Sequence, residues 1–131
     1  EAGQRVERNL SLQLVLGDAE KEIEAIDGPF DAVFLDPFSP ACNPELWRSS
    51  FLAAVRKRTA HGGILTTYSC ARSVRLALLQ AGWQIGEGPR VGMKSSGTLA
   101  STGSVTPPLP PIAEKLNRKL QQLLECDQEG E

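Results

Sequence analysis

The chain has 131 residues, of which 40% are hydrophobic and 23% charged, and its net charge at pH 7 is −2. This size and composition fit one modest soluble domain, and the charge gives no overall attraction to nucleic acid. No apolar run approaches the roughly 20 residues that cross a bilayer, so no membrane contact is expected. Three widely spaced cysteines and one histidine argue against a disulfide framework and a zinc site, and favour the reducing cytoplasm.

Strand and helix patterns alternate along most of the chain. Residues 10–16 are apolar at alternate positions and predict a strand, and residues 19–26 predict a short helix. The continuous apolar run in residues 31–36 predicts a second strand, buried on both faces. The later elements are a helix that Asn43 caps and Gly62-Gly63 ends, a strand over 64–68, a helix over 73–82, a strand over 83–85 and a strand over 97–101. This alternation indicates an α/β sheet.

The composition changes after Ser101. Residues 107–111 hold four prolines and predict a stiff spacer. Residues 112–125 carry apolar side chains at helical spacing and predict an amphipathic helix that packs on the domain or on a partner. We therefore expect three parts: a sheet domain over residues 1–101, a proline-rich linker over 102–111, and a tail helix with a disordered end over 112–131.

The strand over residues 31–36 ends on an acid. Asp36 is followed at once by Pro37, which stops the strand, and then by the aromatic Phe38. Open α/β sheets bind ligands at the carboxyl ends of their strands. Asp36 is therefore the first candidate for a functional residue, since its carboxylate can accept a hydrogen bond from a substrate amine and take up a proton. An aspartate that only caps its own loop is the alternative.

Four segments carry a resemblance to a known family. The most specific is Asp31-Ala-Val-Phe-Leu-Asp-Pro-Phe-Ser-Pro40, followed by Asn43-Pro-Glu-Leu-Trp47. The others are Leu16-Gly-Asp-Ala19, Gly62-Gly-Ile-Leu-Thr-Thr-Tyr-Ser69, and Val74 to Trp83 with Gly92-Met-Lys94. Over residues 10–101 the chain resembles the second half of the MnmC-like methyltransferase domain, a family that acts on a modified wobble uridine in tRNA.

The resemblance implies a Rossmann-like α/β fold, S-adenosylmethionine as cofactor and tRNA as partner. It implies methyl transfer to the aminomethyl nitrogen of 5-aminomethyl-2-thiouridine. Asp36 would then lie near the reacting amine, with Pro37 in the wall of the pocket on the cofactor side. Asp18 and Ala19 would lie near the adenine, and Asp18 can cap a helix at the same time. No flavin is expected, because nothing in the sequence supports a flavin oxidase domain.

Four residues are assigned to the substrate. Phe38 can stack on the base or pack in the core, and Tyr68 can line the pocket or pack on the following helix. Arg90 and Lys94 follow in a Gly-rich loop, where they can contact RNA phosphates or remain solvated. Trp47, on a helical stripe, is expected in the core.

The sequence departs from the family pattern in one respect. Methyltransferases of this class bind the amino-acid end of the cofactor with a Gly-rich turn after the first strand, and this sequence has no such turn. We expect a Rossmann-like sheet that lacks the first two strands. A C-terminal amphipathic helix is expected to follow the sheet. Residues 10–16 would then pair directly with residues 31–36. A partner chain or a missing N-terminal segment would complete the sheet.

Two other functions remain open from the sequence. Without the Gly-rich turn, the chain can be a non-catalytic fragment or one half of an assembly, with no cofactor binding. The segment from Asp36 to Phe38 also resembles segments that hold exocyclic amines, which suggests a methylase of a free amine or of a DNA base. The match through Asn43-Pro-Glu-Leu-Trp47 favours the tRNA substrate.

Overall fold

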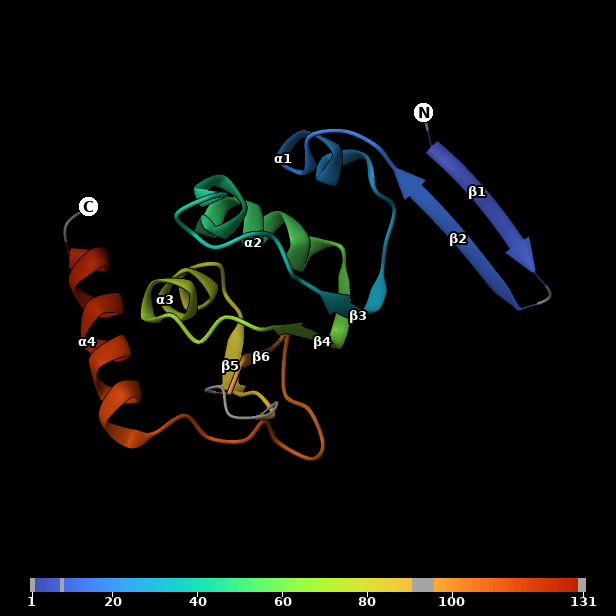
Figure 1. The fold of residues 1–131 in the computed structure, drawn as a ribbon. Coiled ribbons are helices and arrows are strands. Elements are labelled where there is room, and N and C mark those ends of the chain that lie inside the picture. Colours follow the sequence, from blue (N-terminus) through green and yellow to red (C-terminus); the bar gives the residue numbers. More distant parts are fainter. Residues whose placement is uncertain (1, 8, 91–95, 130–131) are drawn as a thin grey trace.

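The computed structural model describes residues 2–7, 9–90 and 96–129, which form two separate sheets (Figure 1). The first is an antiparallel hairpin of β1 (Ala2–Glu7) and β2 (Leu10–Val15). The sequence pattern did not indicate β1. The expected pairing of residues 10–16 with residues 31–36 is wrong, because β2 pairs with the strand beside it in the sequence. A connection this short closes at little cost in chain entropy.

The second sheet has four strands in the order β3-β4-β6-β5. They are β3 (Phe30–Phe34), β4 (Thr59–Thr67), β5 (Gln84–Glu87) and β6 (Thr98–Ser101). β3 runs parallel to β4, with Val33 opposite Leu65, whereas β6 is antiparallel to both β4 and β5. The carboxyl ends of β3 and β4 therefore lie at the same edge of the sheet, where Asp36 and Tyr68 follow them.

Helices connect β2 to β3, β3 to β4 and β4 to β5, as the alternating pattern predicts, and a last helix follows β6. They are α1 (Ala19–Glu22), which continues into the 3-10 helix η1 (Ile23–Ala25), the 3-10 helix η2 (Pro44–Trp47), α2 (Ser49–Lys57), α3 (Arg72–Gln80) and α4 (Glu114–Glu129). The continuous helix expected after Asn43 is wrong. It is divided at Arg48, whose extended ψ of 148° separates η2 from α2.

The glycine pair belongs to a strand rather than to the end of that helix. α2 ends at Lys57, and both Gly62 and Gly63 lie within β4. Gly62 has a φ of 75°, a left-handed conformation that favours glycine. The register of β3 against β4 shifts near these residues, between Phe30 and Ala32. The pair therefore allows β4 to start earlier than the sequence pattern suggests.

The hydrophobic core lies between the four-stranded sheet and the two helices α2 and α3 (Figure 1). Its largest fully buried apolar side chains are those of Leu52, Leu65, Val74, Leu78 and Trp83. Complete burial of one such side chain stabilises the fold by about 1.5–3 kcal/mol. The Trp83 indole N–H donates to the carbonyl oxygen of Leu52 at 3.0 Å, so its polar atom is satisfied inside the core.

The edge formed by β3 is more exposed than its sequence suggests. The prediction that this strand is buried on both faces is wrong, because Phe30 is half-exposed and Phe34 is 79% exposed. β3 has one hydrogen-bonded neighbour among the described strands, β4, and lies at the end of the sheet. Leu10, Leu12 and Leu14 also form an exposed apolar row on β2, since alternate residues of a strand share a face.

The proline-rich segment and α4 pack against the rest of the fold. The carbonyl oxygen of Pro110 accepts a hydrogen bond from the Glu87 amide at 2.8 Å, which ties the segment to β5. α4 lies against α3, with Leu120 fully buried. The Gln80 side chain of α3 donates to Asp127 of α4 at 2.5 Å. In the described part of the chain, no helix has the length and apolar composition that crossing a bilayer requires.

Candidate functional site

Asp36 stands free at the carboxyl edge of the sheet. The Leu35 amide donates to the Thr66 carbonyl at 2.9 Å, which extends the pairing of β3 with β4 one residue beyond the strand. Asp36 follows directly and is exposed. Among the described residues, none makes a hydrogen bond or ion pair with its carboxylate. The carboxylate therefore keeps its acceptor sites available for a ligand.

The backbone of the loop after Asp36 is held by Asn43, the residue before η2, and by Trp47 at the end of η2. The Phe38 amide donates to Oδ1 of Asn43 at 3.2 Å, and the Phe38 carbonyl oxygen accepts from the indole N–H of Trp47 at 2.8 Å. Asn43 also donates from Nδ2 to Glu45 at 3.3 Å. Asn43 was expected to cap the following helix, but its side chain makes no capping bond there and serves the loop instead.

This clamp leaves the Phe38 ring in solvent. The ring is 77% exposed, so the alternative that it packs in the core is wrong. Trp47, by contrast, is 5% exposed, and its predicted place in the core is confirmed. An exposed aromatic ring on an anchored backbone offers a flat apolar surface for stacking.

Tyr68 joins this loop from the neighbouring strand. Its hydroxyl donates to the carbonyl oxygen of Pro37 at 3.0 Å. Its ring meets Trp47 edge-on, with 6.2 Å between ring centroids and 87° between ring planes. The ring is half-exposed, so it contacts η2 and the loop instead of lying buried on the following helix. The structure thus brings Pro37, Phe38 and Tyr68 together beside Asp36.

Asp18 and Ala19 lie at the start of α1. Oδ1 of Asp18 accepts from the Glu20 amide at 3.1 Å, which is the N-cap role considered from the sequence. Oδ2 lies 3.7 Å from the ammonium of Lys21, and both side chains remain largely in solvent. An ion pair of 3.8 Å between Glu20 and Arg48 connects α1 to the segment between η2 and α2. α1 is therefore a neighbour of the element that clamps the Phe38 loop.

Of the two predicted phosphate contacts, the structure describes one. Arg90 is exposed after β5, and its positive charge helps to lower the pKa of Glu87. Lys94 lies outside the described residues. Nothing described joins Arg90 to the Asp36 loop.

Sequence reasoning missed two groups near this edge. The first is the clamp that Asn43 and Trp47 form on the Phe38 backbone. The sequence separation of these residues from Phe38 does not predict the clamp, because it depends on the conformation of the loop. The second is the burial of Arg75, a residue that the sequence placed near a strand end among the possible phosphate contacts; it is 2% exposed, inside the apolar face of α3. An arginine between Val74 and Leu78 is a signal for a buried ion pair, because an unpaired charge there would be costly.

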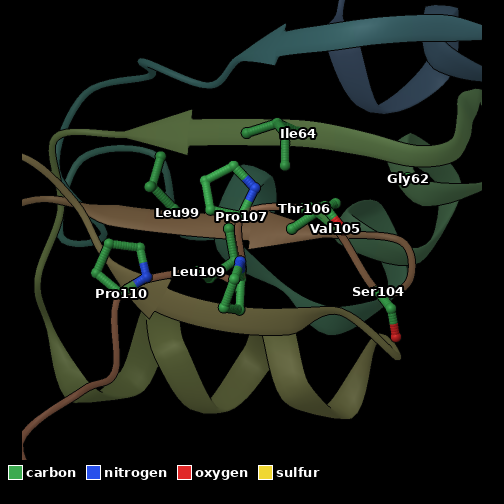
Figure 2. A pocket seen from close by; sticks show the side chains of 10 residues that line it. Gly62, Ile64, Leu99, Ser104, Val105, Thr106, Pro107, Leu109 and Pro110 are labelled. Atoms are coloured by element: carbon green, nitrogen blue, oxygen red, sulfur yellow. The ribbon is translucent and has the colours of Figure 1, made fainter.

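A cavity lies elsewhere in the molecule. It has a volume of about 550 Å³ and lies between β4, β6 and residues 104–110. Figure 2 shows Ile64 and Leu99 on the strands, with Pro107 and Leu109 lying close to them. Its lining includes none of the predicted site residues. The cavity is an apolar gap under the proline-rich segment and is separate from the Asp36 edge.

The geometry defines a class of protein. The four-stranded sheet carries an exposed carboxylate and two aromatic rings at the carboxyl end of its parallel strands, which is where Rossmann-like α/β domains bind their ligands. Within the described residues, no group of three histidine, cysteine, aspartate or glutamate side chains could hold a metal ion.

Comparison with known proteins identifies the family. A family model described as S-adenosyl-L-methionine-dependent methyltransferase matches residues 2–103, and the chain belongs to this family. The crystal structure of MNMC2 from Aquifex aeolicus aligns with a TM-score of 0.78 and 40% sequence identity. The alignment covers 90% of this chain and 38% of that one. The Rossmann-like fold class and the resemblance seen in the sequence are confirmed.

Curated relatives are much longer than this chain. Two of them, from Caulobacter sp. (strain K31) and Caulobacter vibrioides, are described as the tRNA 5-methylaminomethyl-2-thiouridine biosynthesis bifunctional protein MnmC. The identities are 41% over 102 residues and 46% over 83 residues. These alignments cover 76% and 63% of this chain, but only 17% and 14% of the relatives. The chain thus matches less than a fifth of either relative.

The cofactor of this family is S-adenosylmethionine, and the exposed residues at the start of α1 have chemistry that fits part of it. Asp18 uses Oδ1 for one backbone N–H, and a carboxylate has further lone pairs that can accept from the amino group of an adenine. Ala19 beside it is small and exposed. The exposed carboxylate of Asp36 likewise keeps its acceptor sites available for a ligand.

Proposed function

We propose that these residues form the substrate side of a site that transfers a methyl group from S-adenosylmethionine to the aminomethyl nitrogen of a modified wobble uridine in tRNA. The observation that carries the proposal is the unpaired, exposed carboxylate of Asp36 beside the rings of Phe38 and Tyr68. An amine on a planar base needs such an arrangement: an acceptor for its N–H and a surface for its ring.

Asp36 is the residue that prepares the amine. Its carboxylate accepts an N–H of the neutral amine and so directs the nitrogen lone pair at the carbon to be attacked. When bound, the cofactor supplies a methyl group on a positively charged sulfur, which keeps the electron pair of the broken bond. The new C–N bond leaves the nitrogen positively charged, and Asp36 accepts the proton that it then releases. Positioning supplies the larger share of catalysis in such a displacement.

The other predicted residues bind the two reactants. Phe38 stacks on the base, and Tyr68 supports the loop through Pro37 while it borders the pocket. Asp18 and Ala19 hold the adenine. Arg90 and Lys94 meet the phosphates of the RNA. A partner chain or a preceding segment would supply contacts to the remaining part of the cofactor.

Binding of the cofactor product is the first test. Titration calorimetry of S-adenosylhomocysteine into the chain should show binding, and Asp18→Ala should abolish it. Asp31→Asn is the matched control, since Asp31 is also exposed but belongs to β3. Absence of heat at millimolar ligand would favour the non-catalytic alternative for this chain.

Methyl transfer is the second test. Unmethylated tRNA should gain one methyl group on the wobble nucleoside, as detected by mass analysis of digested RNA. Asp36→Asn should lower kcat by about 10²–10⁴, the range of a lost general base, while Asp31→Asn should not. Methylation of DNA or of a free amine, with tRNA untouched, would reject the tRNA substrate in favour of the other alternative.

A further inference from the structure

The buried Arg75 is connected to the candidate site through backbone groups. Its side chain is 3% exposed, and a guanidinium so placed destabilises a fold unless each side of it is paired. Nε donates to the Thr98 hydroxyl at 3.0 Å, and Nη2 donates to the Gly97 carbonyl at 3.1 Å. Nη2 also lies 3.2 Å from a carboxylate oxygen of Glu87. One side chain of α3 thus holds the end of β5 and the start of β6.

The Thr98 hydroxyl passes this connection on to the residue after Tyr68. It accepts from Arg75 and donates to the carbonyl oxygen of Ser69 at 2.7 Å, so its single donor and one of its two acceptor positions are used. Thr98 is fully buried, and no water can take over either bond. The carbonyl group of Ser69, the residue after Tyr68, is therefore tied to Arg75 through the Thr98 hydroxyl.

Gly97 makes a second connection to the same place. A methyl group added at Gly97 would overlap the carbonyl oxygen of Thr67 and lie 3.4 Å from Cα of Tyr68. The backbone at Gly97 is thus in direct contact with the end of β4. Since Arg75 binds the Gly97 carbonyl, it fixes the surface on which the Tyr68 backbone rests.

We propose that Arg75 is a positioning residue for Tyr68. By holding Thr98 and Gly97, it sets the backbone of Thr67–Ser69 and so places the Tyr68 hydroxyl on the Pro37 carbonyl, beside Asp36. Its effect on catalysis rests on the proposed function, but its effect on Tyr68 does not. A purely structural role would destabilise the fold without moving Tyr68 in variants that remain folded.

The chain offers a direct readout, because Tyr68 is its only tyrosine. With ¹³C-labelled tyrosine, NMR gives the ring signals of this residue alone. Arg75→Lys and Thr98→Val should shift these signals toward those of a tyrosine in an unfolded peptide. The buried Trp83 indole N–H should keep its wild-type signal, which shows that the core is intact.

Arg56 provides a matched control. It is also an arginine on a helix that donates to a backbone carbonyl near β6, with Nη2 at 3.0 Å from Thr102. Arg56→Lys should leave the Tyr68 signals unchanged. If Arg75→Lys does not fold, Thr98→Val decides, since it removes the link to Ser69 and keeps the arginine. Unchanged Tyr68 signals in a folded Arg75→Lys or Thr98→Val variant would overturn the proposal.

Kinetics on tRNA adds a test of coupling. Arg75→Lys and Tyr68→Phe should each raise KM for the RNA by about two- to fivefold, the factor that corresponds to one lost hydrogen bond at a half-exposed site. The double variant should be no worse than either single variant, because both changes act through the same contact. Additive effects would contradict the proposal. A wild-type chain without methyl transfer would reject the proposed function and leave the NMR comparison to decide on Arg75.

Discussion

The Tyr68 hydroxyl donates to the carbonyl oxygen of Pro37 at 3.0 Å and so joins the residues that follow two parallel strands. Pro37 lies between the acid and the exposed ring of the loop, Asp36 and Phe38. The bond therefore holds the Pro37 carbonyl of the loop from the β4 side. Asn43 and Trp47 fix the amide and carbonyl of Phe38 from the other side.

Tyr68→Phe should destabilise the fold slightly. It removes one hydrogen bond at a half-exposed site, so the free energy of unfolding should fall by about 0.5–1 kcal/mol. Urea denaturation measures this change. The ring contact with Trp47 remains in the variant, so a loss of several kcal/mol would mean that the ring itself had moved.

Asn43→Ala should loosen the loop without unfolding the core. The Phe38 amide loses its acceptor, and the free energy of unfolding should fall by about 1 kcal/mol. Hydrogen exchange of the Phe38 amide should become faster, while exchange of the Leu65 amide in β4 should change only as the global stability does. Asn117→Ala, on the exposed side of α4, serves as control. Equal exchange at Phe38 in variant and wild type would contradict the clamp.

Leu52→Ala should destabilise strongly, because Leu52 is fully buried between α2 and the sheet. The expected fall in the free energy of unfolding is about 2–5 kcal/mol. Leu12→Ala makes the same chemical change on the exposed row of β2 and should alter stability by no more than about 0.5 kcal/mol. Chemical denaturation of both variants checks the difference, and similar losses would place Leu12 in a buried contact.

The acid stability of the fold should depend on Glu87. Its partial burial raises the pKa, but hydrogen bonds from Ser96 and Arg75 and the charges of Arg75 and Arg90 outweigh this, so the pKa lies below the ordinary 4.5. A carboxyl with a lowered pKa binds fewer protons when folded than when unfolded. Its stabilisation is therefore present above pH 4.5 and disappears as the pH falls through the folded pKa.

Comparison of the wild type with Glu87→Gln tests this dependence. The wild type should be the more stable of the two near neutral pH, and the difference between them should shrink as the pH falls below 4.5. Urea denaturation at several pH values measures it, with the exposed Glu125→Gln as control. A difference that is independent of pH would mean that the carboxyl of Glu87 is not favoured in its charged form.

The sequence predicted the strands and helices better than their partners. The periods of apolar residues located β2, β3, β5, β6 and α4, because each element has a face to bury. The predicted pairing of β2 was wrong because its true partner, β1, was not recognised. β1 contains Gly3 and Arg5 and has only a weak strand pattern, and the structure identifies it as a strand by its pairing with β2. The exposure of Phe34 was not predicted either, since an apolar run does not tell whether its strand lies in the centre or at the edge of a sheet.

The candidate site was only partly visible in the sequence. The position of Asp36 at a strand end followed from the apolar run and Pro37, and the pattern of the family supported it. The role of Asn43 was missed because asparagine at a helix start usually caps that helix, whereas here the Phe38 amide competes for the same oxygen. The burial of Arg75 was missed because its partners, such as Glu87, come from distant parts of the chain.

The position of β3 at the end of the sheet affects how the site is lost. Asp36 follows β3, a strand that is hydrogen-bonded to a single neighbour, β4, among the described strands. The core centres on β4 and the helices that pack on it. Local opening needs the least free energy where backbone bonds are exposed and buried contacts are few. β3 can therefore separate from β4 in a brief fluctuation that leaves α2 and α3 packed. On warming, ligand binding at Asp36 should fail before the helical signal of the chain does.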